Sequence, residues 1–210
     1  MLTNHQIEIL AGNMNVPLEF CNFKSELPKV IKPNRAYIIN LDNDTDLDGD
    51  LNGGTHWVCF QVVKYPNGKL ESIYFDSFAA PPPEIVKKRI RDTFGIKFVP
   101  YNTKNIQSIV SNMCGFFCLA FLHFINHSPY RTQMLYENVE TFLSLFNDLS
   151  LTNDFKHNEY TLKHFFLFKD KPNKPVDVLD DQEKILDSVS GTFSGLNPND
   201  MRVPLDIKYV

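Results

Sequence analysis

A run of apolar residues in the middle of the chain, from Met113 to Asn126, limits the possible folds more than any other segment. The residues are apolar on every side of a helix, so a helix formed here must be buried all round. Its most apolar part, from Cys114 to Phe124, contains His123 and is far too short to cross a bilayer. The run therefore predicts a central helix in the core of a globular domain.

The composition of the chain can supply that core. The 210 residues suit one domain of ordinary size, and 43% of them are hydrophobic, with 18 Phe. The net charge of -4 argues against a general nucleic-acid binder, which needs a basic face to release counterions from the phosphates. No signal peptide is visible, and no apolar stretch is long enough for a membrane span. We therefore expect an intracellular protein that binds neither nucleic acid nor membranes.

The periodicity of apolar residues predicts both helices and strands. Helices are expected over residues 3–12, 81–94, 113–126, 132–146 and 153–168, and strands over 36–41, 57–65, 72–75 and 97–101. The second and third strands are joined through Asn67-Gly68, which is a strong hairpin signal. The expected fold is α+β, with a mixed β-sheet packed on a central helix that starts at Cys114.

The composition changes after residue 168. Residues 169–210 contain prolines and an acidic cluster between Asp180 and Glu183, and they lack the apolar periodicity of an independent domain. We therefore predict a globular domain over residues 1–168 and a proline-containing acidic tail over residues 169–210. The tail is expected either to pack back onto the domain or to tether it to a partner.

The first residue of the central helix, Cys114, is the candidate nucleophile. A thiol attacks only as the thiolate, and its ordinary pKa of about 8.5 leaves little of that form at neutral pH. The unpaired N–H groups at a helix N-terminus favour an anion, and Gly115 leaves room for a substrate backbone. The alternative is a small core residue, which is the interpretation given to Cys21, Cys59 and Cys118. The four cysteines show no spacing typical of a disulfide framework or a zinc site.

A reactive thiol also needs a base, and His56 is the best placed of the six histidines. It lies at the start of a predicted strand, after Gly54 and before Trp57, where an imidazole ring can face a cleft. His123 lies inside the apolar helix and is interpreted as a core histidine that has a hydrogen-bond partner. His127 is interpreted as a cap at the C-terminus of the same helix.

An imidazole that acts as a base is usually held in one tautomer by a carboxylate on its second nitrogen. Asp76 ends the neighbouring strand and is the candidate for this role. A two-residue turn at Asn67-Gly68 would place His56 opposite residue 79, so a bulge or a longer loop is needed to bring Asp76 within reach. From spacing alone, the simpler interpretation of Asp76 is a turn residue that terminates its strand.

Four fragments of the chain carry a resemblance to a known family. They are Gly54-Thr55-His56-Trp57, Tyr74-Phe75-Asp76-Ser77-Phe78, Gln107 and Met113-Cys114-Gly115-Phe116-Phe117-Cys118. In this order they resemble the adenovirus-type cysteine proteases (adenain) and the related ubiquitin-like-protein proteases, whose chain order is His, Asp or Glu, Gln, Cys. The resemblance covers roughly residues 50–126, and it is to a protease of a small double-stranded DNA virus, such as a virophage or a Polinton-type element.

The resemblance implies a thiol endopeptidase whose catalytic domain is residues 1–168. It implies that Cys114 attacks the scissile carbonyl and that His56 takes the thiol proton and returns it to the leaving amine. Asp76 orients the imidazole and favours its charged form. Gln107 donates its side-chain amide to the oxyanion, together with the backbone N–H of Cys114.

The resemblance also implies a substrate class and a place of action. Trp57, Gly54 and Gly115 are expected at a narrow substrate-binding cleft, which favours glycine next to the scissile bond. The expected partners are protein substrates, namely capsid or other virion precursors that are cleaved during maturation. The enzyme is expected to be a monomer in the virion and in the viral factory of the host cytoplasm.

Three other functions remain open at this point. A deubiquitinase or SUMO-type isopeptidase that acts on host proteins would use the same triad, and so would an effector-type acyltransferase. The acyltransferase needs phosphate-rich ligands, which an acidic chain is poorly suited to bind. A binding module without catalysis is disfavoured because all four chemical positions are intact. Adenain uses DNA and a peptide as activators, but the acidic charge argues against DNA here, and no cysteine for linking a peptide can be identified.

The acidic segment from Asp44 to Asp50 matches the first half of a calcium loop of the Asp-x-Asp-x-Asp-Gly kind. The twelfth position of such a loop is a bidentate Glu, and here it is Thr55. We therefore expect a solvated acidic loop, with no metal and no other cofactor. Because the segment adjoins His56, it could favour basic residues in a substrate.

Overall fold

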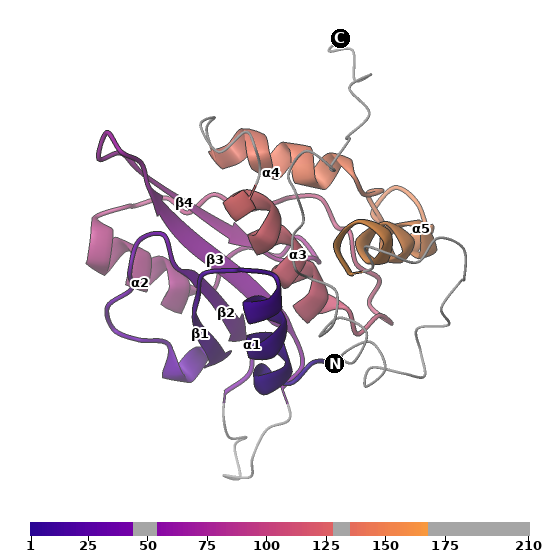
Figure 1. The fold of residues 1–210 in the computed structure, drawn as a ribbon, viewed down its shortest axis with the longest axis horizontal. Helices are drawn as coiled ribbons and strands as arrows, with labels where there is room; N and C mark the ends of the chain where they lie inside the picture. Colours follow the sequence, from indigo (N-terminus) through magenta and orange to yellow (C-terminus); the bar gives the residue numbers. More distant parts are fainter. Residues whose placement is uncertain (44–53, 128–134, 168–210) are drawn as a thin grey trace.

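The structure is a computed structural model in which residues 1–43, 54–127 and 135–167 are described. Its centre is a four-stranded sheet with the order β1-β2-β3-β4 (Figure 1). The strands are β1 (Leu18–Phe23), β2 (Ala36–Asn40), β3 (Trp57–Lys64) and β4 (Leu70–Phe75). β1 pairs with β2 in parallel, and the β2–β3 and β3–β4 pairs are antiparallel. The fold is therefore α+β with a mixed sheet, as predicted.

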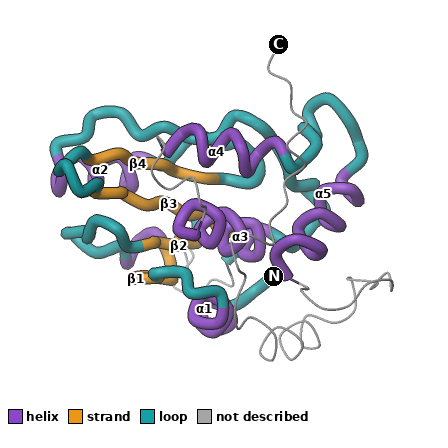
Figure 2. The backbone as a smooth tube through the Cα atoms, turned by 45° about the horizontal axis from the view of Figure 1, so that its top comes forward, coloured by secondary structure: helices purple, strands orange, loops and turns teal. Residues whose placement is uncertain are grey.

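Helices cover both faces of this sheet. They are α1 (Asn4–Asn13), α2 (Glu84–Phe94), α3 (Cys114–His127), α4 (Leu135–Ser144) and α5 (Phe155–Leu162), with the short helical segments η1 (Lys24–Glu26) and η2 (Lys163–Leu167). Figure 2 shows α3 between α1 and α4, and α3 contacts both of these helices as well as β3. Buried side chains of α2 belong to a second apolar cluster, on the opposite face of the sheet.

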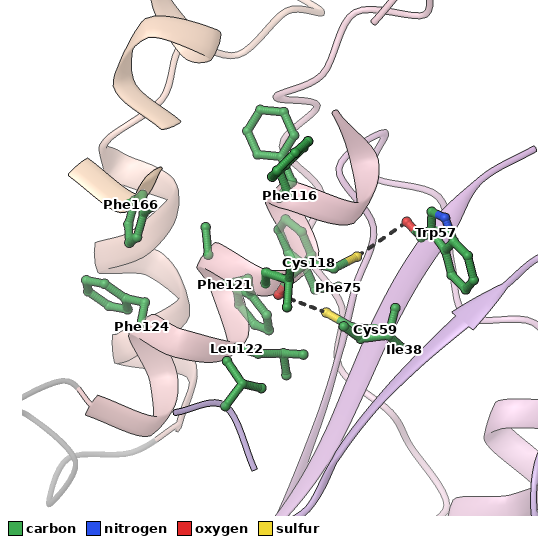
Figure 3. Close-up of a cluster of buried hydrophobic side chains, with 14 of the residues drawn as sticks. Ile38, Trp57, Cys59, Phe75, Phe116, Cys118, Phe121, Leu122, Phe124 and Phe166 are labelled. Atoms are coloured by element: carbon green, nitrogen blue, oxygen red, sulfur yellow. Dashed lines mark hydrogen bonds between the residues drawn. The ribbon is translucent and has the colours of Figure 1, made fainter. Parts of the chain in front are cut away.

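The central helix α3 is buried at every residue from Cys114 to Asn126, as its all-round apolar sequence predicts. Its aromatic residues lie in one buried cluster with Phe75 of β4 (Figure 3), and Phe142 of α4 belongs to the same cluster. The rings of Phe75 and Phe121 stack with centroids 4.3 Å apart, and Phe142 meets both rings edge-on. This packing fixes the position of α3 against β4, and the first residue of α3 is held with it.

The side chains of successive residues in the inner strands belong to different apolar clusters, one on each face of the sheet. Ile38 and Cys59 belong to the cluster around α3, whereas Tyr37 and Phe60 belong to the cluster around α2. Side chains of a strand alternate between the two faces of a sheet, so a sheet covered on both faces needs apolar residues at consecutive positions. The continuous apolar run that begins at Trp57 is explained by this double coverage.

The hairpin between β3 and β4 differs from the predicted one. The N–H of Tyr65 donates to the carbonyl of Lys69 at 2.9 Å, so the turn spans residues 66–68 rather than only Asn67 and Gly68. Gly68 has a φ of 84°, the left-handed conformation that ends such a loop at low steric cost. The longer turn shifts the pairing of the two strands by one residue relative to the prediction.

Two other strand assignments are corrected by the structure. Residues 97–101 form no strand, and only an isolated bridge joins Tyr101 to Tyr74. The carbonyl of Pro100 accepts the N–H of Tyr74, but proline has no N–H to extend a ladder. Conversely, the edge strand β1 was not predicted, because its residues are mostly half-buried and Glu19 and Asn22 break up its apolar pattern.

Some predictions fall on residues that the structure does not describe. The tail over 169–210 and the acidic segment from Asp44 to Asp50 lie outside the described residues. Of the helix predicted over 132–146, residues 135–144 are confirmed as α4, and of the helix predicted over 153–168, residues 155–167 are confirmed as α5 followed by η2. Within the described part of the chain, none of the helices combines the length and the apolar character needed to span a bilayer.

Candidate active site

The ends of two paired strands bring His56 and Asp76 together. His56 directly precedes β3 and Asp76 directly follows β4, and the Nε2 of His56 lies 2.8 Å from Oδ1 of Asp76. A turn over residues 76–79 closes the gap that strand register alone would leave. In this turn the N–H of Phe78 donates to Oδ1 of Asp76, and the N–H of Ala79 donates to its carbonyl, both at 2.8 Å. Asp76 is therefore both the turn residue and the histidine's partner, and no bulge is needed.

The backbone of Asp76 is fixed by an asparagine from a distant segment. Asn102 accepts the N–H of Asp76 at 2.9 Å and donates its amide to the carbonyl of Asp76 at 2.7 Å. The same amide donates to the carbonyl of Lys104. Both residues are buried, so these bonds satisfy backbone groups that water cannot reach. Asn102 thereby holds the carboxylate at the end of β4.

The environment of His56 favours its charged form. Burial opposes the charge, but hydrogen bonds and charge interactions with Asp76 and Cys114 outweigh it and raise the pKa of His56 to about 9. The ring stacks on Phe78 with centroids 4.5 Å apart. Because Nε2 is bonded to Asp76, the other ring nitrogen, Nδ1, is the one left to exchange a proton with Cys114.

Cys114 occupies the place predicted for it, as the first residue of α3. The carbonyl of Met113 accepts the N–H of Phe117 at 3.0 Å, which is the first hydrogen bond of the helix. The N–H groups of the first turn have no partner further up the helix and point toward its N-terminal end, where they favour an anion. Cys114 is only 1% exposed, so access to its sulfur is narrow.

Gln107 lies in the loop between α2 and α3, seven residues before Cys114, and both ends of its side-chain amide are hydrogen-bonded. Its Oε1 accepts the hydroxyl of Ser77 at 2.7 Å, and its Nε2 donates to the carbonyl of Ser111 at 2.8 Å. The side chain is buried. An amide nitrogen carries two hydrogens, so the bond to Ser111 leaves a second one to donate.

The three residues expected at the substrate cleft have structural contacts. Trp57 is 5% exposed, and its indole N–H donates to the carbonyl of Leu2 at 2.8 Å. A side chain on Gly115 would meet Leu2 at 3.2 Å and Ile7 at 3.3 Å, so the N-terminal segment fills the space that was expected to admit a substrate. In this structure Trp57 and Gly115 pack against the N-terminal segment, and the aromatic partner of the imidazole is Phe78.

Gly54 is required by the loop that carries His56. It has a φ of 73°, and a Cβ there would lie 2.4 Å from the side-chain nitrogen of Asn40. Asn40 accepts the N–H groups of Asp42 and Thr55, which lie on either side of the acidic segment. The glycine therefore permits a close approach that positions His56, which is bonded through its carbonyl to the N–H of Leu41.

The other histidines and cysteines of the core have structural roles. His123 is buried and donates from Nδ1 to the carbonyl of Met14 at 2.8 Å, as expected of a core histidine with a partner. His127 bonds the carbonyl of Asn15 rather than capping its own helix. The thiol of Cys118 donates to the carbonyl of Trp57 at 3.4 Å, deep in the core (Figure 3).

Sequence reasoning missed three residues that position the site: Asn40, Asn102 and Ser77. Asn and Ser next to turns are ordinary loop residues, so their type carries no signal. Their partners lie far away along the chain, as with Asn102 and Asp76, and only the folded sheet brings them together. Ser77 was visible only as part of a fragment that also contains Asp76.

Compared with known proteins, the chain matches no family model and no curated protein sequence. The function must therefore be argued from the arrangement itself. A buried thiol begins a buried helix, an imidazole with a raised pKa interacts with that thiol, and a carboxylate holds the second nitrogen of the imidazole. This arrangement can generate a nucleophilic thiolate and shuttle one proton.

Proposed function

We propose that this protein is a thiol endopeptidase in which Cys114 is the nucleophile. The observation that carries the proposal is the position of His56, which interacts with Asp76 on one side and with Cys114 on the other. Nucleophile, base and orienting group in contact are the signature of covalent acyl transfer. The order of these groups along the chain agrees with the resemblance to adenain-like proteases and favours peptide bonds as the substrate.

The first half of the proposed reaction forms an acyl-enzyme. The Cys114 thiol gives its proton to Nδ1 of His56, and the thiolate attacks the scissile carbonyl carbon. A C–S bond forms while the carbonyl π electrons move to oxygen and give a tetrahedral oxyanion. When this collapses, the C–N bond breaks and the leaving amine takes the proton from His56. Asp76 keeps the imidazole oriented through both transfers.

The second half of the reaction restores the enzyme. His56 takes a proton from a water molecule, which attacks the thioester carbonyl and releases the acid product together with the Cys114 thiolate. Both tetrahedral species carry an oxyanion, for which Gln107 and the backbone N–H of Cys114 are the proposed donors. Loss of one such donor typically lowers kcat by about 10² to 10³-fold.

The proposed substrates are precursors of virion proteins, such as capsid precursors, that are cut at glycine-containing sites. The small exposed fraction of Cys114 supports glycine at the cleavage site, because a bulky neighbouring side chain would meet the walls around the sulfur. On this proposal the enzyme acts as a monomer in the virion and in the host cytoplasm. The isopeptidase function would use the same chemistry on a different substrate.

Co-expression of the full chain with the structural proteins encoded by the same genome tests this proposal. The wild type should shorten one or more of them at a defined site, and Cys114→Ala should leave them intact. Cys21→Ala is the matched control, because Cys21 is a buried residue of the edge strand β1, which β2 separates from β3, and it should not affect cutting. Cleavage that persists in Cys114→Ala would overturn the assignment. Cleavage of ubiquitin-like fusions alone would select the isopeptidase function instead.

A further inference from the structure

Ser77 connects the acid of the site to the oxyanion donor. It follows Asp76 directly and is fully buried at 0% exposure. Its carbonyl accepts the backbone N–H groups of Ile106 and Gln107 at 2.9 and 3.1 Å. Its hydroxyl donates to Oε1 of Gln107 at 2.7 Å. Ser77 therefore joins the turn that contains Asp76 to the loop that contains Gln107 through three hydrogen bonds, two accepted by its carbonyl and one donated by its hydroxyl.

The two side-chain hydrogen bonds of Gln107 determine which end of its amide is the oxygen and which is the nitrogen. The carbonyl of Ser111 can only accept, so the nitrogen end of the amide must face it. The oxygen end then faces Ser77, whose hydroxyl supplies the donor that a buried carbonyl oxygen requires. Because the amide is planar and both of its ends are hydrogen-bonded, the second N–H of Nε2 is held in one direction. A fixed donor is what oxyanion stabilisation requires, since it costs no reorganisation during the reaction.

The geometry points to Ser77 as the positioning residue of the oxyanion donor. Its hydroxyl holds the Gln107 amide in the orientation that donates to the tetrahedral intermediate, while its carbonyl anchors the backbone of the same loop. This inference rests on the proposed endopeptidase function, in which Gln107 contacts the reacting oxygen. The bonds of Ser77 go to Gln107 and Ile106, and so its inferred role is exercised through Gln107.

Steady-state kinetics of Ser77→Ala in the full chain, with a peptide that contains the mapped cleavage site, tests the inference. We expect kcat to fall about tenfold with KM unchanged, which is less than the 10² to 10³-fold typical for complete loss of a donor. The rate of Cys114 alkylation by iodoacetamide should stay at the wild-type value, because the contacts of His56 with Asp76 and Cys114 are untouched. Ser108→Ala is the matched control, since its hydroxyl bonds Val110 and not Gln107.

A double-mutant cycle separates positioning from a general structural effect. If Ser77 acts through Gln107, then Ser77→Ala should cause no further loss of kcat in a Gln107→Ala background. If Ser77→Ala does not fold, Ser77→Thr and Ser77→Val form a pair of equal shape, of which only the threonine keeps the hydroxyl. The threonine variant should then exceed the valine variant about tenfold in kcat at equal melting temperature.

Several results would overturn the inference. They are an unchanged kcat in Ser77→Ala, an equal fold-loss in the Gln107→Ala background, equal kcat values for the Thr and Val variants, or slower alkylation of Cys114. Failure of the proposed function has a different signature, because a wild type that cuts no protein or peptide removes the reference activity itself. The two failures are thus told apart by the wild type alone.

Discussion

The first and second turns of α3 each carry a buried cysteine, and the two thiols have opposite surroundings. Cys114 is 1% exposed and interacts with His56, whose pKa it helps to raise. Cys118 is 0% exposed and donates its thiol to the carbonyl of Trp57. Burial, followed by the neighbouring Cys59, raises the pKa of Cys118 well above its ordinary value. The two thiols are therefore about equally buried, but Cys114 has an imidazole partner whereas Cys118 is a protonated thiol of the core.

The two thiols differ in their partners and not in their exposure, and this difference separates the proposed nucleophile from a core residue. Low-dielectric surroundings disfavour any thiolate, so an anion forms there only beside a cation and unpaired N–H groups. The first turn provides both, since the N-terminal N–H groups and His56 are close to Cys114. At the second turn the N–H groups are bonded within the helix, and the neighbours of the Cys118 thiol are the carbonyl of Trp57 and the thiol of Cys59.

Of the changes that test the difference between Cys114 and Cys118, removal of the His56 imidazole should cause the largest loss of activity. We expect His56→Ala to lower kcat/KM by on the order of 10⁴-fold or more, because the first turn then lacks both its base and its cation. Asp76→Asn should leave a measurable remnant, since an orienting group matters less than the base. Peptide hydrolysis by purified variants measures both. His123→Ala is the control, because that imidazole bonds Met14 in the core, and a folded variant should stay active.

Alkylation at different pH values sharpens the comparison in the intact protein. At pH 7 iodoacetamide should modify Cys114 at least about 10²-fold faster than Cys118 or Cys21, whose pKa values burial raises. Because the pKa of His56 is raised to about 9, its positive charge persists up to that pH and is lost above it. On the proposed function, the paired imidazolium should therefore keep the Cys114 rate nearly constant until its charge is lost near pH 9. An ordinary thiol instead reacts about tenfold faster per pH unit up to about pH 8 and levels off above about 8.5, and mass mapping would reveal that behaviour.

The first two turns of α3 and the residues around them also show which features the sequence alone could predict. The all-round apolar character of residues 113–126 was sufficient to predict α3, its burial and the position of Cys114 at its start. The contact between His56 and Asp76 could not be derived from strand spacing. It depends on a turn beyond β4 that spacing does not encode, and the resemblance alone paired the two residues. The roles of Asn102 and Ser77 could not be found, because their residue types are common in loops and their partners are distant in sequence.

Truncation of the second-turn thiol should have the smallest effect on activity. We expect Cys118→Ala to keep kcat/KM within about twofold of the wild type, because the thiol contacts a core carbonyl and not the imidazole. Its free energy of unfolding should fall by about 1 kcal/mol, since the lost sulfur leaves a small void beside Trp57. Cys114→Ala should lose turnover, and because Cys114 is as buried as Cys118, its free energy of unfolding should fall by a similar amount. Denaturant unfolding and peptide hydrolysis on the two variants measure both quantities. Equal loss of turnover in both would mean that the two turns are not chemically distinct, and the assignment of Cys114 would fail.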